Sequence, residues 1–179
     1  SAESKYGPGV TETEIKIGNA APYTGVFSEY AAEERAQTAY FQMINDRGGI
    51  NGRRIVYVSV DDGSDSRNAG QLARRLVERD GVLLIFSSFG TGGSLAMRSY
   101  LNEQHVPQLF VQSSAAMFDD PAPFPWPLCF FASFRTQASA SARYLVTSRP
   151  AAHVGALHPH DPARPAHLAT LRHPPPHQP

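Results

Sequence analysis

The sequence has 179 residues, which is enough for one domain with a hydrophobic core, or for one domain and part of a second. Apolar residues make up 41% of it and the formal net charge is zero, so neither disorder of the whole chain nor electrostatic binding to nucleic acid or an anionic membrane is expected. Cys129 is the one cysteine, which excludes an intrachain disulfide. No run approaches the roughly 20 apolar residues of a membrane-spanning helix. The first ten residues lack a basic-then-apolar signal pattern, so we expect that a signal peptide is absent or already removed.

Strand and helix patterns alternate regularly over the first 120 residues. Period-two or continuously apolar runs predict strands, and runs with apolar residues three and four apart predict helices. The strands are expected at 14–20, 54–62, 81–86 and 106–112, and the helices at 31–47, from 65 or 66 onward, and at 94–105. In the first helix, the apolar face is expected to comprise Ala36, Tyr40, Met43 and Ile44. Such alternation predicts right-handed βαβ crossovers and an α/β fold, a Rossmann-like parallel sheet flanked by helices.

The character of the sequence changes after residue 120. The stretch "DDPAPFPWPLCFF" is rich in proline and aromatic residues, as in a chain that crosses between lobes. A helix is expected at 134–150 with Tyr144 and Leu145 facing inward, and 151–157 could form one more strand. Repeated prolines and the lack of hydrophobic periodicity predict that 158–179 is disordered. The predicted organisation is an amino-terminal α/β lobe at 1–125, a hinge crossover with the start of a second lobe at 126–157, and a disordered Pro/His-rich tail at 158–179.

Three loops follow strands of the predicted sheet, at 20–30, 87–94 and 112–118. Because the carboxyl ends of parallel strands meet at one edge, these loops are expected to lie together, where open α/β sheets bind their ligands. The loop "SSFGTGGS" lacks the lysine of a phosphate-binding P-loop, and its glycines do not have the spacing of a dinucleotide fingerprint. It could instead accept a carboxylate, with amides 90–92 and the Thr91 hydroxyl at a helix start, or it could be a simple helix cap.

The other candidate residues have weaker signals. Ser113 and Ser114 in "QSSAAMF" could donate hydrogen bonds or belong to a plain polar loop, and Tyr30 could line a site or pack at a helix start. Asp61 and Asp62 could act as general bases or metal ligands, although a strand end of this type is commonly a turn and a cap. Six of the seven histidines lie in or beside the tail, so no catalytic triad, metal site or cofactor is predicted, and no enzyme activity.

Several stretches resemble the amino-terminal lobe of periplasmic binding proteins of the branched-chain amino-acid type, the solute receptors of ABC importers. They are "YGPGVTETEIKIGNAAPYTGVFSEYA", "YFQMINDRGGINGRRIVYVSVDDG", "LVERDGVLLIFSSFGTGGSLAM", "YLNEQHVPQLFVQSSAA" and "FPWP". The resemblance covers residues 6 to about 150 and fades after 126. It implies a type I binding-protein fold, in which two α/β lobes clamp a ligand between them. It also implies a periplasmic location, a membrane permease as partner, and amino acids or related small carboxylates as ligands.

The resemblance further implies a set of ligand-binding positions in the first lobe, where two loops hold the ligand's carboxylate and an aromatic side chain lines the cleft. Ala116 stands where this family commonly has a hydroxyl residue, so one donor is lost. The candidates are Tyr30, Phe89, Gly90, Thr91, Ser113, Ser114, Ala115 and Ala116.

The resemblance also implies that a second lobe is missing. A full receptor of this type is about twice as long, and the stretch "LHPHDPARPAHL" replaces the pattern expected there, which suggests truncation or a frameshift after about residue 150. We therefore expect weak or no ligand binding. The alternatives are a cytoplasmic ligand-sensing domain on the same fold, a nucleotide-dependent enzyme, and a gene remnant without function.

Overall fold

A five-stranded parallel sheet forms the centre of the protein in the computed structural model, which describes residues 5–149, 151 and 153–155. The strand order is β2-β1-β3-β4-β5, and every neighbouring pair is parallel, as the sequence predicts. The longest register joins β1 and β2 along their whole length, from Glu14 opposite Arg54 to Ala21 opposite Asp61. The strands are β1 (Glu14–Ala21), β2 (Arg54–Asp61), β3 (Ile85–Phe86), β4 (Gln108–Val111) and β5 (Pro127–Cys129).

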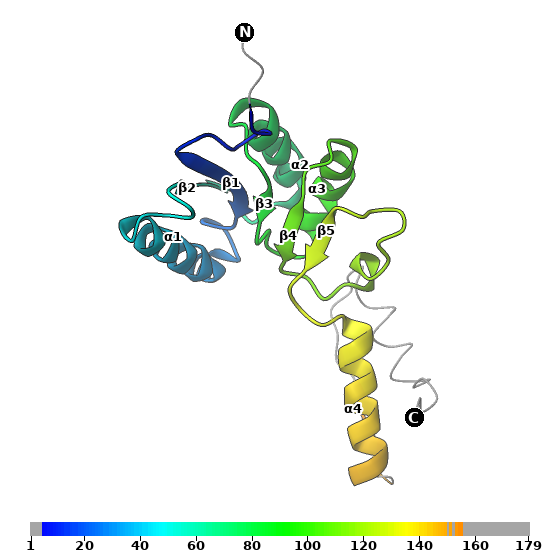
Figure 1. The fold of residues 1–179 in the computed structure, drawn as a ribbon. Coiled ribbons are helices and arrows are strands. Elements are labelled where there is room, and N and C mark those ends of the chain that lie inside the picture. Colours follow the sequence, from blue (N-terminus) through cyan, green and yellow to red (C-terminus); the bar gives the residue numbers. More distant parts are fainter. Residues whose placement is uncertain (1–4, 150, 152, 156–179) are drawn as a thin grey trace.

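Helices cover both faces of this sheet (Figure 1). They are α1 (Ala31–Asp46), α2 (Ser66–Arg74), α3 (Thr91–Glu103) and α4 (Phe134–Ser148). Asp65 caps the amino-terminal end of α2 by accepting a hydrogen bond from the backbone of Arg67, and the helix continues as a π-helical turn through Arg75–Arg79. Helix α1 ends as expected at a glycine, because Gly48 and Gly49 adopt positive φ angles there. Helix α4 extends away from the sheet (Figure 1).

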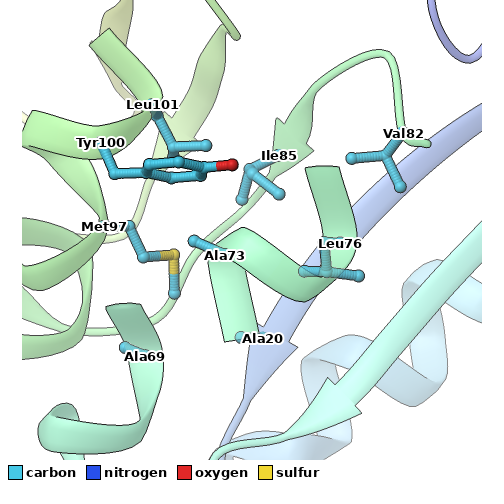
Figure 2. Close-up of a cluster of buried hydrophobic side chains, with 9 residues drawn as sticks. All are labelled: Ala20, Ala69, Ala73, Leu76, Val82, Ile85, Met97, Tyr100 and Leu101. Atoms are coloured by element: carbon cyan, nitrogen blue, oxygen red, sulfur yellow. The ribbon is translucent and has the colours of Figure 1, made fainter. Parts of the chain in front are cut away.

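The hydrophobic core lies between the sheet and the pair of helices α2 and α3 (Figure 2). Leu76, Ile85, Met97 and Leu101 are almost completely buried there. Burial of each such side chain contributes roughly 1.5–3 kcal/mol, so this cluster holds α2 and α3 against the sheet. The complete cluster is Ala20, Ala69, Ala73, Leu76, Val82, Ile85, Met97, Tyr100 and Leu101.

The inward face of α1 differs from the expected one. Ala36 and Tyr40 are exposed, whereas Ala31 and Glu34 are buried. The reason is that the inward stripe carries polar side chains with partners on the sheet, including Glu34, whose Oε2 lies 3.0 Å from the Tyr57 hydroxyl oxygen. Met43 and Ile44 are half-buried as expected, so the hydrophobic pattern predicts the inward residues near the end of α1 and misses those at its start.

Two expectations for the region after residue 126 were wrong in detail. Tyr144 of α4 does not face inward, because its side chain is 64% exposed, while Leu145 is half-buried. Residues 151 and 153–155 do not belong to a strand, and the rest of the candidate strand and the tail 158–179 lie outside the described residues. The structure also adds β5, which pairs with β4 just beyond the predicted lobe boundary at 125. The division into lobe, hinge and tail stays a prediction.

Candidate ligand-binding site

The three predicted loops do meet at the carboxyl edge of the sheet. Phe89 and Gln112 form an isolated parallel bridge, and the Gly90 N–H donates to the Gln112 carbonyl at 3.2 Å. The hydroxyl oxygens of Thr91 and Ser113 lie 2.9 Å apart, so the loops after β3 and β4 are joined side chain to side chain. The loop after β1 joins them through Tyr30, whose ring centroid lies 4.7 Å from that of Phe89.

A cavity of about 360 Å³ opens between these loops and the loop that follows β2. Four of the eight candidate residues line it: Tyr30, Phe89, Gly90 and Thr91. The other four, Ser113, Ser114, Ala115 and Ala116, are not among its lining residues. The complete lining is Pro22, Phe27, Tyr30, Asp62, Ser64, Ser66, Phe89, Gly90, Thr91, Gly92 and Gly93.

The amino-terminal end of α3 forms one wall of the cavity. Gly90 precedes the helix with φ 74° and ψ 157°, a conformation that is nearly restricted to glycine. Its N–H is not available to a ligand as expected, because it donates to Gln112. The first intrahelical bond runs from the Ser94 N–H to the Gly90 carbonyl, so the N–H groups of residues 91–93 have no partner within the helix. Those groups and the positive end of the helix dipole suit an anionic group.

The loop after β4 supports this wall from behind. Ser113 is buried, and its hydroxyl oxygen accepts the Ala115 N–H at 3.1 Å while it also contacts Thr91. Ser114 is bound to the start of α4, because its hydroxyl accepts from Gln137 and its carbonyl from the Phe134 N–H. These residues therefore set the position of the Thr91 hydroxyl.

Aromatic rings form the outer part of the cavity. The centroids of Phe27 and Phe89 lie 6.0 Å apart, and those of Phe27 and Tyr30 lie 6.5 Å apart in an edge-to-face arrangement. The side chains of Phe27 and Tyr30 are about half exposed. The rings thus present an apolar surface next to the polar start of α3, a combination that suits a small ligand with one charged end and one apolar end.

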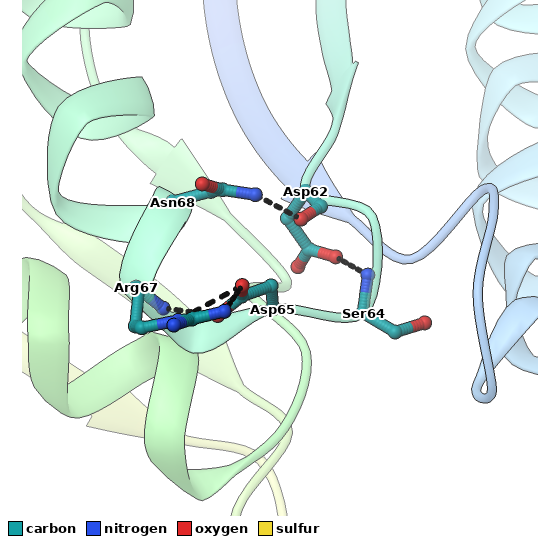
Figure 3. Close-up of polar contacts among 5 residues, drawn as sticks. All are labelled: Asp62, Ser64, Asp65, Arg67 and Asn68. Atoms are coloured by element: carbon teal, nitrogen blue, oxygen red, sulfur yellow. Dashed lines mark hydrogen bonds and ion pairs between the residues drawn. The ribbon is translucent and has the colours of Figure 1, made fainter.

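Sequence reasoning missed the wall that follows β2, which contributes Asp62, Ser64 and Ser66 to the cavity. The sequence predicts a general base, a metal ligand or a turn and cap at Asp61 and Asp62, and Asp61 does form a turn by accepting hydrogen bonds from Thr24 and Gly63. Burial raises the pKa of Asp62, with a hydrogen bond from Ser64 opposing the shift (Figure 3). Its place at a strand end could have revealed it, since β2 ends at the same edge as β1 and β3.

Two further classes of site have no support in the described part of the chain. Residues 5–149, 151 and 153–155 contain no group of three or more His, Cys, Asp or Glu side chains placed to hold a metal ion. Within the same residues, no helix has the length and apolar character that crossing a membrane requires.

Comparison with known proteins agrees with the fold. The family model for periplasmic binding proteins matches residues 14–170, which is most of the chain. The chain belongs to the periplasmic binding protein family. The Leu/Ile/Val-binding protein homolog 7 of Brucella abortus (strain 2308) is 32% identical over 96 residues, covering 53% of this chain and 24% of that protein. The chain spans about a quarter of the length of the curated relatives it matches.

Solved structures of this periplasmic binding protein family share the fold. A branched-chain amino acid ABC transporter protein from Thermus thermophilus with bound valine superposes with a TM-score of 0.74 and 21% identity, covering 91% of this chain and 42% of that one. A fatty acid ABC transporter substrate-binding protein from Thermomonospora curvata gives a TM-score of 0.69 and 24% identity, covering 82% and 36%. The two proteins are named for different ligands, so the shared fold does not identify the ligand of this chain.

Proposed function

We propose that this chain is the carboxylate-binding part of a non-enzymatic solute receptor of an ABC importer, with amino acids or related small carboxylates as ligands. The observation that carries the proposal is the cavity at the carboxyl edge of the sheet, where the free N–H groups at the start of α3 lie beside the Thr91 hydroxyl. No lysine, arginine or histidine is among the described residues that line this cavity, so it suits a single carboxylate better than the phosphates of a nucleotide. We further propose that the receptor works in the periplasm and delivers its ligand to a membrane permease.

Binding by this chain alone is expected to be weak. Receptors of this fold desolvate a ligand by closing two lobes around it, and here the described residues provide contacts from one sheet edge. We expect dissociation constants of about 1 mM or weaker. Selectivity for the ligand's side chain would need contacts from a second lobe facing this cavity. The carboxylate is therefore the ligand group that this part of the receptor recognises.

The proposal is tested by titrating the ¹⁵N-labelled chain with L-leucine, 4-methylpentanoate and benzoate and following the amide resonances. We expect saturable shifts centred on residues 90–93, with smaller shifts at 113–116. Replacement of Thr91 by valine removes one hydroxyl without changing the side-chain shape. A hydrogen bond to a charged group contributes about 1.5–3 kcal/mol, so we expect an affinity loss of about tenfold or more.

The matched control is Thr147→Val, because the Thr147 hydroxyl contacts only carbonyl groups of its own helix, α4. This variant should bind as the unmodified chain does. If none of the three ligands shifts any resonance of the cavity, the chain does not bind carboxylates and the proposal is wrong. Micromolar binding would contradict the expectation that the site is half of a clamp.

A further inference from the structure

A second cavity, of about 500 Å³, opens beside α1, where Glu33 and Gln37 of that helix line it. Its size is typical of sites that bind small molecules. None of its described lining residues lines the cavity at the start of α3, which we call the first cavity. Most of its wall consists of four phenylalanine rings, those of Phe86, Phe110, Phe130 and Phe131.

The Ser87 hydroxyl group is a buried donor that faces this cavity. Ser87 is 5% exposed and is among the lining residues. Its oxygen accepts one N–H from Gln37 Nε2 at 2.9 Å and another from Gln112 Nε2 at 2.8 Å. These two bonds use both lone pairs of the oxygen, so the hydroxyl group can only donate further. Among the residues that the structure describes, no acceptor is bonded to its hydrogen, which is therefore available to a molecule in the cavity.

Neighbouring groups hold Ser87 in this arrangement. Gln37 Oε1 lies 2.8 Å from the Tyr57 hydroxyl oxygen, from which it accepts, so its amide nitrogen must face Ser87. The Ser87 backbone has a φ of 58° and is held by bonds from its N–H to Leu109 and from Asn19 to its carbonyl. A left-handed conformation in a residue other than glycine is costly, and residues of this kind cluster at functional sites.

Phe110 forms part of the wall in a similarly strained conformation, with a φ of 57°. The register of β4 and β5 shifts between Leu109 and Val111, and such irregularities redirect side chains. The Phe110 ring meets those of Phe86 and Phe130 edge to face, with centroids 5.6 Å and 6.4 Å away. Phe110 and Phe130 remain exposed, so an aromatic ring bound in the cavity would bury apolar surface and add further edge contacts.

The charge of the second cavity differs from that expected of a carboxylate site. Among its described lining residues, Glu33 is the one with a charged side chain, and it is exposed at the start of α1. A carboxylate would bring a second negative charge toward Glu33, whereas an uncharged molecule would not. The aromatic walls and the single free donor thus suit an uncharged aromatic molecule with one oxygen acceptor.

We propose that the second cavity binds a small uncharged aromatic compound whose carbonyl oxygen accepts a hydrogen bond from the Ser87 hydroxyl. This ligand class differs from the amino acids and carboxylates assigned to the first cavity. The inference goes beyond the proposed function and does not depend on it, because the two cavities have different lining residues.

The test uses acetophenone, which resembles benzoate in shape but carries no charge. The ¹⁵N-labelled chain is titrated with each compound, at a protein concentration at which sedimentation velocity shows a monomer. We expect acetophenone to cause saturable amide shifts at residues 86–87, 110–112 and 130–131, with smaller shifts at 90–93. Benzoate should show the opposite distribution.

The role of the hydroxyl is tested with Ser87→Ala. A hydrogen bond between uncharged groups contributes modestly, so we expect acetophenone to bind about fivefold more weakly to this variant. In α-methylstyrene a CH₂ group replaces the carbonyl oxygen, so its affinity should be the same for both chains. The matched control is Ser139→Ala, because the Ser139 hydroxyl donates to the Arg135 carbonyl of its own helix, α4. This variant should bind acetophenone as the unmodified chain does.

Three results would overturn the inference. The first is the absence of acetophenone shifts at the second cavity, and the second is an equal effect of Ser87→Ala on acetophenone and α-methylstyrene. The third is a set of shifts at 110 and 130 that follow protein concentration rather than acetophenone, because a second copy of the chain would then occupy the cavity. Failure of benzoate to bind would contradict only the proposed function. Should Ser87→Ala not fold, the position of the acetophenone shifts in the unmodified chain decides.

Discussion

At the scale of single residues, the most unusual group is Glu34, which is buried beneath α1 with 1% of its surface exposed. The Tyr57 hydroxyl lies 3.0 Å from Glu34 Oε2 and 2.8 Å from Gln37 Oε1, and Gln37 in turn donates to Ser87. The single phenolic hydrogen of Tyr57 cannot be donated to both acceptors. A protonated Glu34 would donate to the Tyr57 oxygen, and the phenolic hydrogen of Tyr57 would then be donated to Gln37. The pKa of Glu34 is accordingly raised to about 7, chiefly by burial, with the Tyr57 hydrogen bond opposing the shift.

This shift makes the free energy of unfolding depend on pH. The folded-state pKa of about 7 exceeds the ordinary value of 4.5, so the folded chain keeps a proton that the unfolded chain has lost between these values. The stabilisation is complete below about pH 4.5 and is lost as pH rises through about 7, amounting to about 3 kcal/mol. Urea unfolding at pH 5 and pH 8 should show this loss in the unmodified chain and not in Glu34→Gln. The exposed neighbour Glu33→Gln should keep it, and equal losses in all three chains would contradict the assignment.

At the scale of elements, the order of strands and helices could be predicted from the sequence because burial on both sides produces runs such as 81–86 that are apolar throughout. The inward face of α1 could be predicted only in part, because its Glu34 and Gln37 are satisfied by Tyr57 and Ser87, which come from distant parts of the chain. The candidate site likewise depends on residues that are distant in the sequence and meet only in the fold. Tyr30 and the amides 90–92 could be predicted from their loops after the strands and Phe89 from the family resemblance, whereas the place of Asp62 in the same cavity emerges only from the structure.

The start of α3 depends on the backbone conformation of Gly90. A side chain at φ 74° and ψ 157° is strained even though no atom lies within 4 Å of the β-carbon position. Gly90→Ala should therefore lower the free energy of unfolding by about 1–3 kcal/mol through backbone strain alone. Gly7→Ala is the matched control, because that position is equally open and its φ is not positive. Thermal unfolding of both variants checks this, and equal stability would show that the loop can adopt another conformation at no cost.

At the scale of the whole molecule, the two faces of the sheet differ in how well they are covered. The face beneath α2 and α3 holds the closed core, whereas the face beneath α1 continues into a row of phenylalanine rings. The ring centroids of Phe86 and Phe110 lie 5.6 Å apart, and those of Phe110 and Phe130 lie 6.4 Å apart. These rings lie beside the second cavity, of about 500 Å³. Phe130 is 67% exposed, and Phe110 and Phe131 are also exposed. A contiguous aromatic surface of this kind favours association with other apolar surfaces.

We therefore expect this chain to self-associate through the row Phe110, Phe130 and Phe131. Sedimentation velocity should show a mean mass that rises with protein concentration, and a dye that fluoresces on apolar surfaces should bind the folded chain. Phe130→Ser should reduce both effects without a large loss of stability, because a ring already exposed to water contributes little to folding. Tyr144→Ser, an equally exposed aromatic position on α4, should leave both unchanged because it lies outside the row. A chain that stays monomeric at all concentrations would mean that this surface is too small to drive association.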